Sequence, residues 1–182
     1  SSSRRSLRIL DGITNETIIE EGMVINIDCP VKYKNFYTDA TINVEVGDVD
    51  EEKKILNKIA YNCLMETINI IKPGIKVKDI SKFQEEHAMK NNYKVIKIFR
   101  GHGVGLNLHE PPSIPYFYDK NNIYNDYEIR EGNVFTIEPL LVTTEDIILG
   151  DDKWSYRTVD GSFGTYWEHT VLITKNNVQI LT

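Results

Sequence analysis

The stretch RGHGVGLNLHE, residues 100–110, decides the reading of this chain, and the alternating segment 93–99 before it predicts a β-strand. The stretch is not a phosphate-binding loop, because its glycines lack the GxGxxG spacing and prolines rather than a helix follow it. It is not the helical HExxH zinc motif either, because Pro111 and Pro112 follow the His-Glu pair directly. Glycines that flank a histidine at a strand end let the backbone approach closely and leave the imidazole open to a ligand.

Two of the four histidines, His102 and His109, lie in this stretch. A single histidine is more often structural, whereas two in one glycine-rich segment favour a binding site. We interpret His87, on an expected helix, and His169, on an expected strand, as structural or supporting residues.

The surrounding sequence predicts strands, then two helices, then strands. Residues 22–46 alternate as a hairpin with a polar loop at 32–35, and a helix is expected from a cap at Asp48 or Asp50 to Pro73-Gly74. A second helix should end at Asn91-Asn92, and a loop rich in Tyr and Asn is expected at 115–130. Further strands are expected at 134–137, 147–149, 156–159, 165–174 and 178–181. This order predicts one α+β domain over residues 1–182 with a largely antiparallel sheet.

Two aspartates in the hairpin are candidate metal ligands. If the turn centres on residues 33–34, Asp28 faces Asp39 across the strands with Cβ atoms about 5 Å apart. Two like charges at that distance are destabilising, and a divalent cation between them would remove the repulsion. Alternatively, the register differs and one aspartate points to solvent.

Two glutamates lie inside apolar strands, Glu138 in FTIEP and Glu168 in WEHT. An unpaired carboxylate is costly there, unless these are solvated edge positions. Together with Asp28, Asp39 and His102 they form a set of mostly oxygen ligands with one imidazole. Such a set suits a pair of first-row divalent ions such as Mn, Fe, Co or Zn.

The composition of the chain limits its expected binding partners and compartment. The chain has 182 residues, with 21 Lys+Arg against 27 Asp+Glu and a net charge of −6, so direct binding to nucleic acid or to an anionic membrane is not expected. Two cysteines make no disulfide framework, which suggests a reducing compartment, and we expect a cytoplasmic protein. The opening SSSRRSLR allows an organellar alternative if residues 1–9 are a tail left from a transit peptide. It is equally a cloning remnant or a plain polar lead-in.

The order of these motifs, from about residue 10 to residue 182, resembles the methionine aminopeptidases, metallopeptidases of family M24 with the pita-bread (creatinase/aminopeptidase) fold. That fold is a curved, mainly antiparallel sheet covered by helices. GHGVGLNLHEPP is also similar to the proline-specific relatives, prolidase and Xaa-Pro aminopeptidase. WEHT follows the methionine aminopeptidase pattern, and the short interval from His102 to Glu138 resembles type I.

The resemblance implies an enzyme that removes the N-terminal methionine from nascent proteins and peptides. A hydroxide would bridge two divalent ions (Co, Mn, Fe or Zn). The ions would be held by Asp28, Asp39, His102, Glu138 and Glu168. Glu138 would also be the general base, and His109 would hydrogen-bond to the scissile carbonyl. Leu108 and Trp154 would line the pocket for the first side chain. The expected partners are peptide or nascent-protein N-termini and the ribosome, with the enzyme itself a monomer.

Two departures from the family pattern bear on activity. Asp11 stands where the family has a substrate-contacting histidine, and an ionised carboxylate cannot donate a hydrogen bond. The family's N-terminal segment, which supplies part of the pocket wall, is also expected to be missing. The alternatives are therefore a proline-directed peptidase of the same fold and a non-catalytic pita-bread module that binds peptide or protein.

Overall fold

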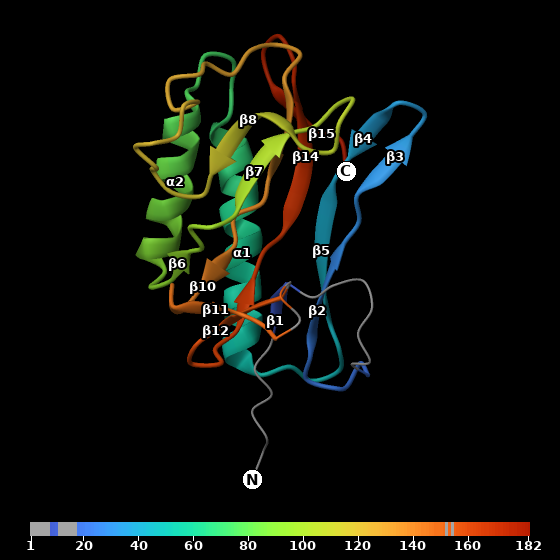
Figure 1. Cartoon of the computed structure of the whole chain (residues 1–182), viewed down its shortest axis with the longest axis vertical. Helices are drawn as coiled ribbons and strands as arrows, with labels where there is room; N and C mark the ends of the chain where they lie inside the picture. The colour runs from blue at the N-terminus through green and yellow to red at the C-terminus, as the bar shows by residue number, and fades with distance from the viewer. Residues whose placement is uncertain (1–7, 11–17, 152, 154) are drawn as a thin grey trace.

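The computed structural model describes residues 8–10, 18–151, 153 and 155–182. Two helices lie side by side against one part of a sheet, and the hairpin strands extend beyond them (Figure 1). The helices are α1 (Glu51–Ile70) and α2 (Val77–Lys90). Neither of these two described helices is long and apolar enough to cross a membrane.

All strand pairs are antiparallel, and the main sheet has seven strands in the order β2-β5-β14-β9-β7-β8, with β15 beside β14. These strands are β2 (Val24–Asp28), β5 (Ala40–Glu45), β7 (Arg100–Gly103), β8 (Glu110–Pro115), β9 (Val134–Ile137), β14 (Glu168–Ile173) and β15 (Val178–Ile180). The smaller sheets contain β1 (Arg8–Leu10), β3 (Val31–Tyr33), β4 (Phe36–Thr38), β6 (Lys94–Val95), β10 (Leu141–Val142), β11 (Ile147–Leu149), β12 (Tyr156–Thr158) and β13 (Gly164–Thr165). The predicted α+β class with a mainly antiparallel sheet is confirmed.

Strand alternation separates an apolar face of the sheet from a polar one. Phe135 and Ile137 on β9 and Val171 on β14 are buried in one core cluster with residues of α1 and α2. The intervening Thr136 and Thr170, which pair across the same strands, lie on the opposite face. Because the helices take up the apolar face, the polar face is left for a site.

The predicted hairpin register is wrong by two residues. The structure pairs Asp28 with Thr41, and Asp39 falls in the break between β4 and β5. The turn is centred one residue later than predicted because Lys34, with φ 54°, adopts the left-handed conformation inside it. A shift by an even number of residues keeps every side chain on its face, so Asp28 and Asp39 remain neighbours.

Several predicted elements differ from the observed ones. Of segment 93–99 only β6 is extended, and the strand that carries His102 starts at Arg100, so its glycines lie within β7 rather than after it. The proline segment 111–115, for which no strand was predicted, forms most of β8, and the predicted 165–174 strand is divided into β13 and β14. Asp50 precedes α1 but makes no side-chain cap hydrogen bond. The expected tail 1–9 is partly in β1, which pairs with β12, and residues 1–7 lie outside the described residues.

The glycines beside His102 are required by close backbone contacts. A Cβ atom at Gly101 would lie 2.6 Å from the Thr136 carbonyl oxygen, and one at Gly103 would overlap the Pro111 carbonyl. These backbone groups cannot move without breaking the pairing of β7 with its neighbours.

We therefore expect Gly103→Ala to lower the free energy of unfolding by about 2 kcal/mol or more, measured by urea denaturation. Gly105→Ala is the matched control, because its added methyl group meets the end of the flexible Glu110 side chain, which can rotate away. Equal urea midpoints for the two variants would contradict this packing argument.

Candidate metal centre

Five neighbouring strands bring the five predicted ligands to one end of the polar face. They are Asp28 at the end of β2, Asp39 before β5, His102 in β7, Glu138 after β9 and Glu168 at the start of β14. All five line one cavity of about 180 Å³. Its other lining residues are Phe99, Arg100, His109, Tyr116, Leu140 and Tyr166.

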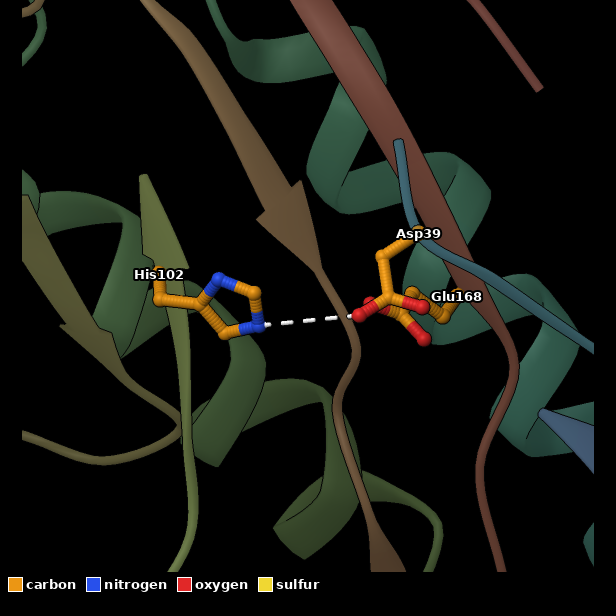
Figure 2. A group of neighbouring side chains, drawn as sticks. All are labelled: Asp39, His102 and Glu168. Atoms are coloured by element: carbon orange, nitrogen blue, oxygen red, sulfur yellow. Dashed lines mark ion pairs between the residues drawn. The ribbon is translucent and has the colours of Figure 1, made fainter. Parts of the chain in front are cut away.

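The donor atoms lie at distances that suit a metal ion rather than direct hydrogen bonds. His102 Nε2 is 3.6 Å from Glu138 Oε1 and 4.0 Å from Asp39 Oδ2. Ligand atoms of Asp39, His102 and Glu168 all lie within 4.8 Å of one another, and their side chains point toward a common centre (Figure 2). Nitrogen and oxygen ligands about 2 Å from a shared ion lie at most about 4 Å apart, a limit that both distances from His102 Nε2 meet.

Three of the carboxylates, Asp39, Glu138 and Glu168, are buried or half-buried, and no described Lys or Arg forms an ion pair with them. Burial raises the pKa of Asp39 to about 6, and the nearby Asp28 charge adds to the shift. Burial also raises the pKa of Glu138 to about 8, although hydrogen bonds from Thr136 and Tyr116 act in the opposite direction. The pKa of Glu168 rises to about 10, because of burial first and then the charges of Glu138 and Asp39. A bound divalent cation would reverse these shifts.

His102 is suited to bind such an ion as a neutral ligand. Burial lowers its pKa, and its Nδ1 lies 3.0 Å from the Gly103 carbonyl oxygen. A neutral ring that donates from Nδ1 to this carbonyl leaves the Nε2 lone pair facing the carboxylates. The donor set therefore fits a divalent first-row metal.

Hydroxyl groups hold the carboxylates in place. Thr41 donates to Glu168 over 2.8 Å, and Tyr166 donates to Asp28 over 3.3 Å. Glu138 accepts from Thr136 on Oε1 and from Tyr116 on Oε2, each over 2.8 Å. These contacts fix the orientation of the carboxylate oxygens before any ion binds.

Sequence reasoning missed all four of these hydroxyl donors. Thr136 and Tyr166 each precede a predicted glutamate by two residues, and in a strand that spacing means a shared face, so a signal for them existed. Tyr116 has no local signal, because only the pairing of β7 with β8 brings it toward Glu138.

The remaining predicted residues have mixed outcomes. His109 is exposed, lines the cavity and has its ring centroid 4.2 Å from that of His102. Leu108 is half-buried but is not one of the described lining residues, so its pocket role stays a prediction. Trp154 and Asp11 lie outside the described residues. Away from the cavity, His87 lies 3.2 Å from Glu66, and His169 contacts the hydroxyl of Thr182.

The raised pKa values predict proton release on metal binding. At pH 7, Glu138 and Glu168 hold protons in the metal-free protein while Asp39 is mostly ionised, so filling the site should displace about two protons. Calorimetric titration with MnCl₂ in buffers of different ionisation enthalpy measures that number. A binding heat that is the same in every buffer would show that both glutamates are already ionised.

The antiparallel sheet with one imidazole and four carboxylates on its polar face defines a metal-dependent hydrolase-type centre. The sequence model of metallopeptidase family M24 matches residues 1–175, so the chain belongs to this family. Within it, the chain is similar to methionine aminopeptidases. Methionine aminopeptidase 1 of Dictyostelium discoideum is 35% identical over 176 residues, which cover 96% of this chain and 47% of that protein.

Two solved structures are also similar to this chain. A methionine aminopeptidase from Thermotoga maritima aligns with a TM-score of 0.86 and 35% identity over 92% of this chain and 66% of that chain. A prolidase from Pyrococcus furiosus aligns with a TM-score of 0.75 and 28% identity over 94% of this chain and 44% of that chain. The chain thus spans between about half and two thirds of the length of these relatives.

Proposed function

We propose that this chain carries the catalytic centre of a metal-dependent aminopeptidase that removes the N-terminal methionine from peptides and nascent proteins. The observation that supports this most directly is the convergence of His102 and four carboxylates, three of them buried or half-buried, from five strands on one cavity. The similarity to methionine aminopeptidases adds the substrate class.

The cavity residues divide the chemistry among them. Asp28, Asp39, His102, Glu138 and Glu168 would hold two divalent ions, whose chemistry when bound is to lower the pKa of water and polarise a carbonyl. Glu138 accepts a proton from the attacking water and passes it to the leaving amine. His109, beside His102 at the exposed side, hydrogen-bonds to the scissile carbonyl.

Exopeptidase specificity follows from the negative charge of the site. The free N-terminal ammonium or amine of a peptide is attracted to the carboxylate cluster, of which Asp28 is the exposed member. A chain interior has no such group, so cleavage would be confined to the first peptide bond.

A proline-directed peptidase is the second candidate, supported by the alignment with the Pyrococcus furiosus prolidase. The two functions differ in substrate only. A non-catalytic binding module is the third reading, for which a metal-free site under saturating Mn²⁺ or Co²⁺ would be the evidence.

The test is cleavage of Met-Ala-Ser against Xaa-Pro peptides with added Mn²⁺, Co²⁺ or Zn²⁺, with bound metal measured by elemental analysis. We expect metal uptake, cleavage of the methionyl peptide, and loss of cleavage after chelation that is restored by adding the ion back. Faster cleavage of Xaa-Pro peptides would select the second candidate, and metal uptake without cleavage of either would refute an aminopeptidase.

A further inference from the structure

Arg100 is a cation in the cavity that the proposed reaction does not use. It is the first residue of β7, two residues before His102, so the two side chains lie on the same face of the strand. Among the described lining residues it is the only Lys or Arg, and it is exposed. An arginine in a cavity rich in carboxylates would be expected to pair with one of them.

The structure shows no such pairing. No described carboxylate forms an ion pair with Arg100. The guanidinium charge is thus available to something that enters the cavity.

The position of Arg100 relative to the five proposed metal ligands limits what its guanidinium can bind. Residues two apart on a strand are separated by about 7 Å, which is the length of about two residues of an extended peptide. A peptide whose N-terminus lies at the carboxylate cluster therefore brings its first or second residue to Arg100. The apolar Phe99 and Leu140 line the same cavity and reduce the competition from water for the guanidinium.

We propose that Arg100 makes this cavity select peptides that carry a carboxylate within their first two residues. The guanidinium donates two parallel hydrogen bonds to a carboxylate, a geometry that neither an amide nor a thioether side chain reproduces. The carboxylate has three sources: the first side chain, the second side chain, or the terminal carboxyl group of a dipeptide. This inference deepens the proposed function, on which it rests for the placement of the substrate's N-terminus.

Three matched pairs of peptides separate these sources. The first is Glu-Ala-Ser-amide against Gln-Ala-Ser-amide, and the second is Met-Glu-Ser-amide against Met-Gln-Ser-amide. The third is Met-Ala as free acid against Met-Ala-amide. Affinity is measured by calorimetry on the Mn²⁺-loaded chain, and cleavage is followed separately.

We expect at least one acidic member to bind about tenfold or more tightly than its amide partner. Arg100→Gln should abolish that preference, and Arg100→Lys should retain part of it because the charge remains while the paired hydrogen bonds are lost. Lys94→Gln, which removes the charge of an exposed residue in β6 outside the cavity lining, is the matched control and should keep the full preference.

Each outcome supports or overturns the inference about Arg100. No preference in any pair, an unchanged preference in Arg100→Gln, or no binding of any peptide would overturn the inference. A preference that depends on Arg100, without cleavage of any peptide, would sustain it and refute the proposed catalysis. Cleavage without the preference would overturn the inference and support the proposed catalysis.

Discussion

Glu138→Gln should reduce kcat/KM for methionyl peptide cleavage by about a thousandfold, a typical loss for removing a general base. The amide matches the carboxylate in size but cannot accept and return a proton. Burial places the pKa of Glu138 near 8 in the metal-free cavity, and Thr136 and Tyr116 hold its two oxygens over 2.8 Å. These two hydrogen bonds hold the carboxylate in a fixed orientation inside the cavity, where it can take up and return a proton.

The control separates loss of the base from loss of the metal. Tyr116→Phe keeps the carboxylate and removes one hydrogen bond to it, so we expect about a tenfold fall in kcat with metal content unchanged. Elemental analysis of both variants should accompany the kinetics. Activity of Glu138→Gln equal to that of the unaltered chain, at equal metal content, would refute the mechanism.

The metal-free chain should become less stable as pH rises from about 5 to 9. Asp39, Glu138 and Glu168 have folded pKa values of about 6, 8 and 10, all above their ordinary values. An acid whose pKa is raised by folding favours the folded state while it is protonated. That stability is fully present below the unfolded pKa near 4 and is lost as pH rises through each folded pKa.

The expected slope is about 2 to 3 kcal/mol per pH unit near pH 7, because the folded state holds about two more protons than the unfolded chain there. Urea denaturation in EDTA at several pH values measures it. Saturating Mn²⁺ should reverse the trend, because the ion stabilises the ionised carboxylates, adding about 3 kcal/mol at a hundredfold excess over Kd.

Glu168→Gln is the decisive variant for this effect, since it removes the group with the highest pKa. Without metal it should be more stable than the unaltered chain at pH 8, with a shallower slope, and Mn²⁺ should no longer stabilise it fully. Glu131→Gln, at an exposed glutamate outside the cavity lining, should behave as the unaltered chain does. Identical slopes for all three proteins would show that the carboxylates are not desolvated together.

The local sequence was sufficient wherever a short-range pattern carries the information. Strand alternation predicted β9 correctly, helical periodicity and Pro73-Gly74 predicted α1, and glutamates inside apolar strands marked Glu138 and Glu168. These inferences hold because burial of one face of an element is repeated every two or every three to four residues, and a short window reveals it.

Other features depend on which residues meet after the sheet closes. The two-residue error at Asp28 and Asp39 arose in a turn whose left-handed residue, Lys34, carries no glycine or asparagine signal. The prolines of β8 give no local strand signal, yet they form a strand because β7 pairs with them at the edge of the sheet.

The sequence by itself determined the chemical identity of the centre: one imidazole, four carboxylates, and two glycines beside the imidazole. Only the tertiary structure decided that Tyr116 reaches Glu138 and that Arg100 enters the cavity without a described partner. The physical reason is that a residue's chemistry belongs to the residue, whereas its neighbours are set by strand order and register. Those depend on contacts between segments as far apart as residues 28 and 166.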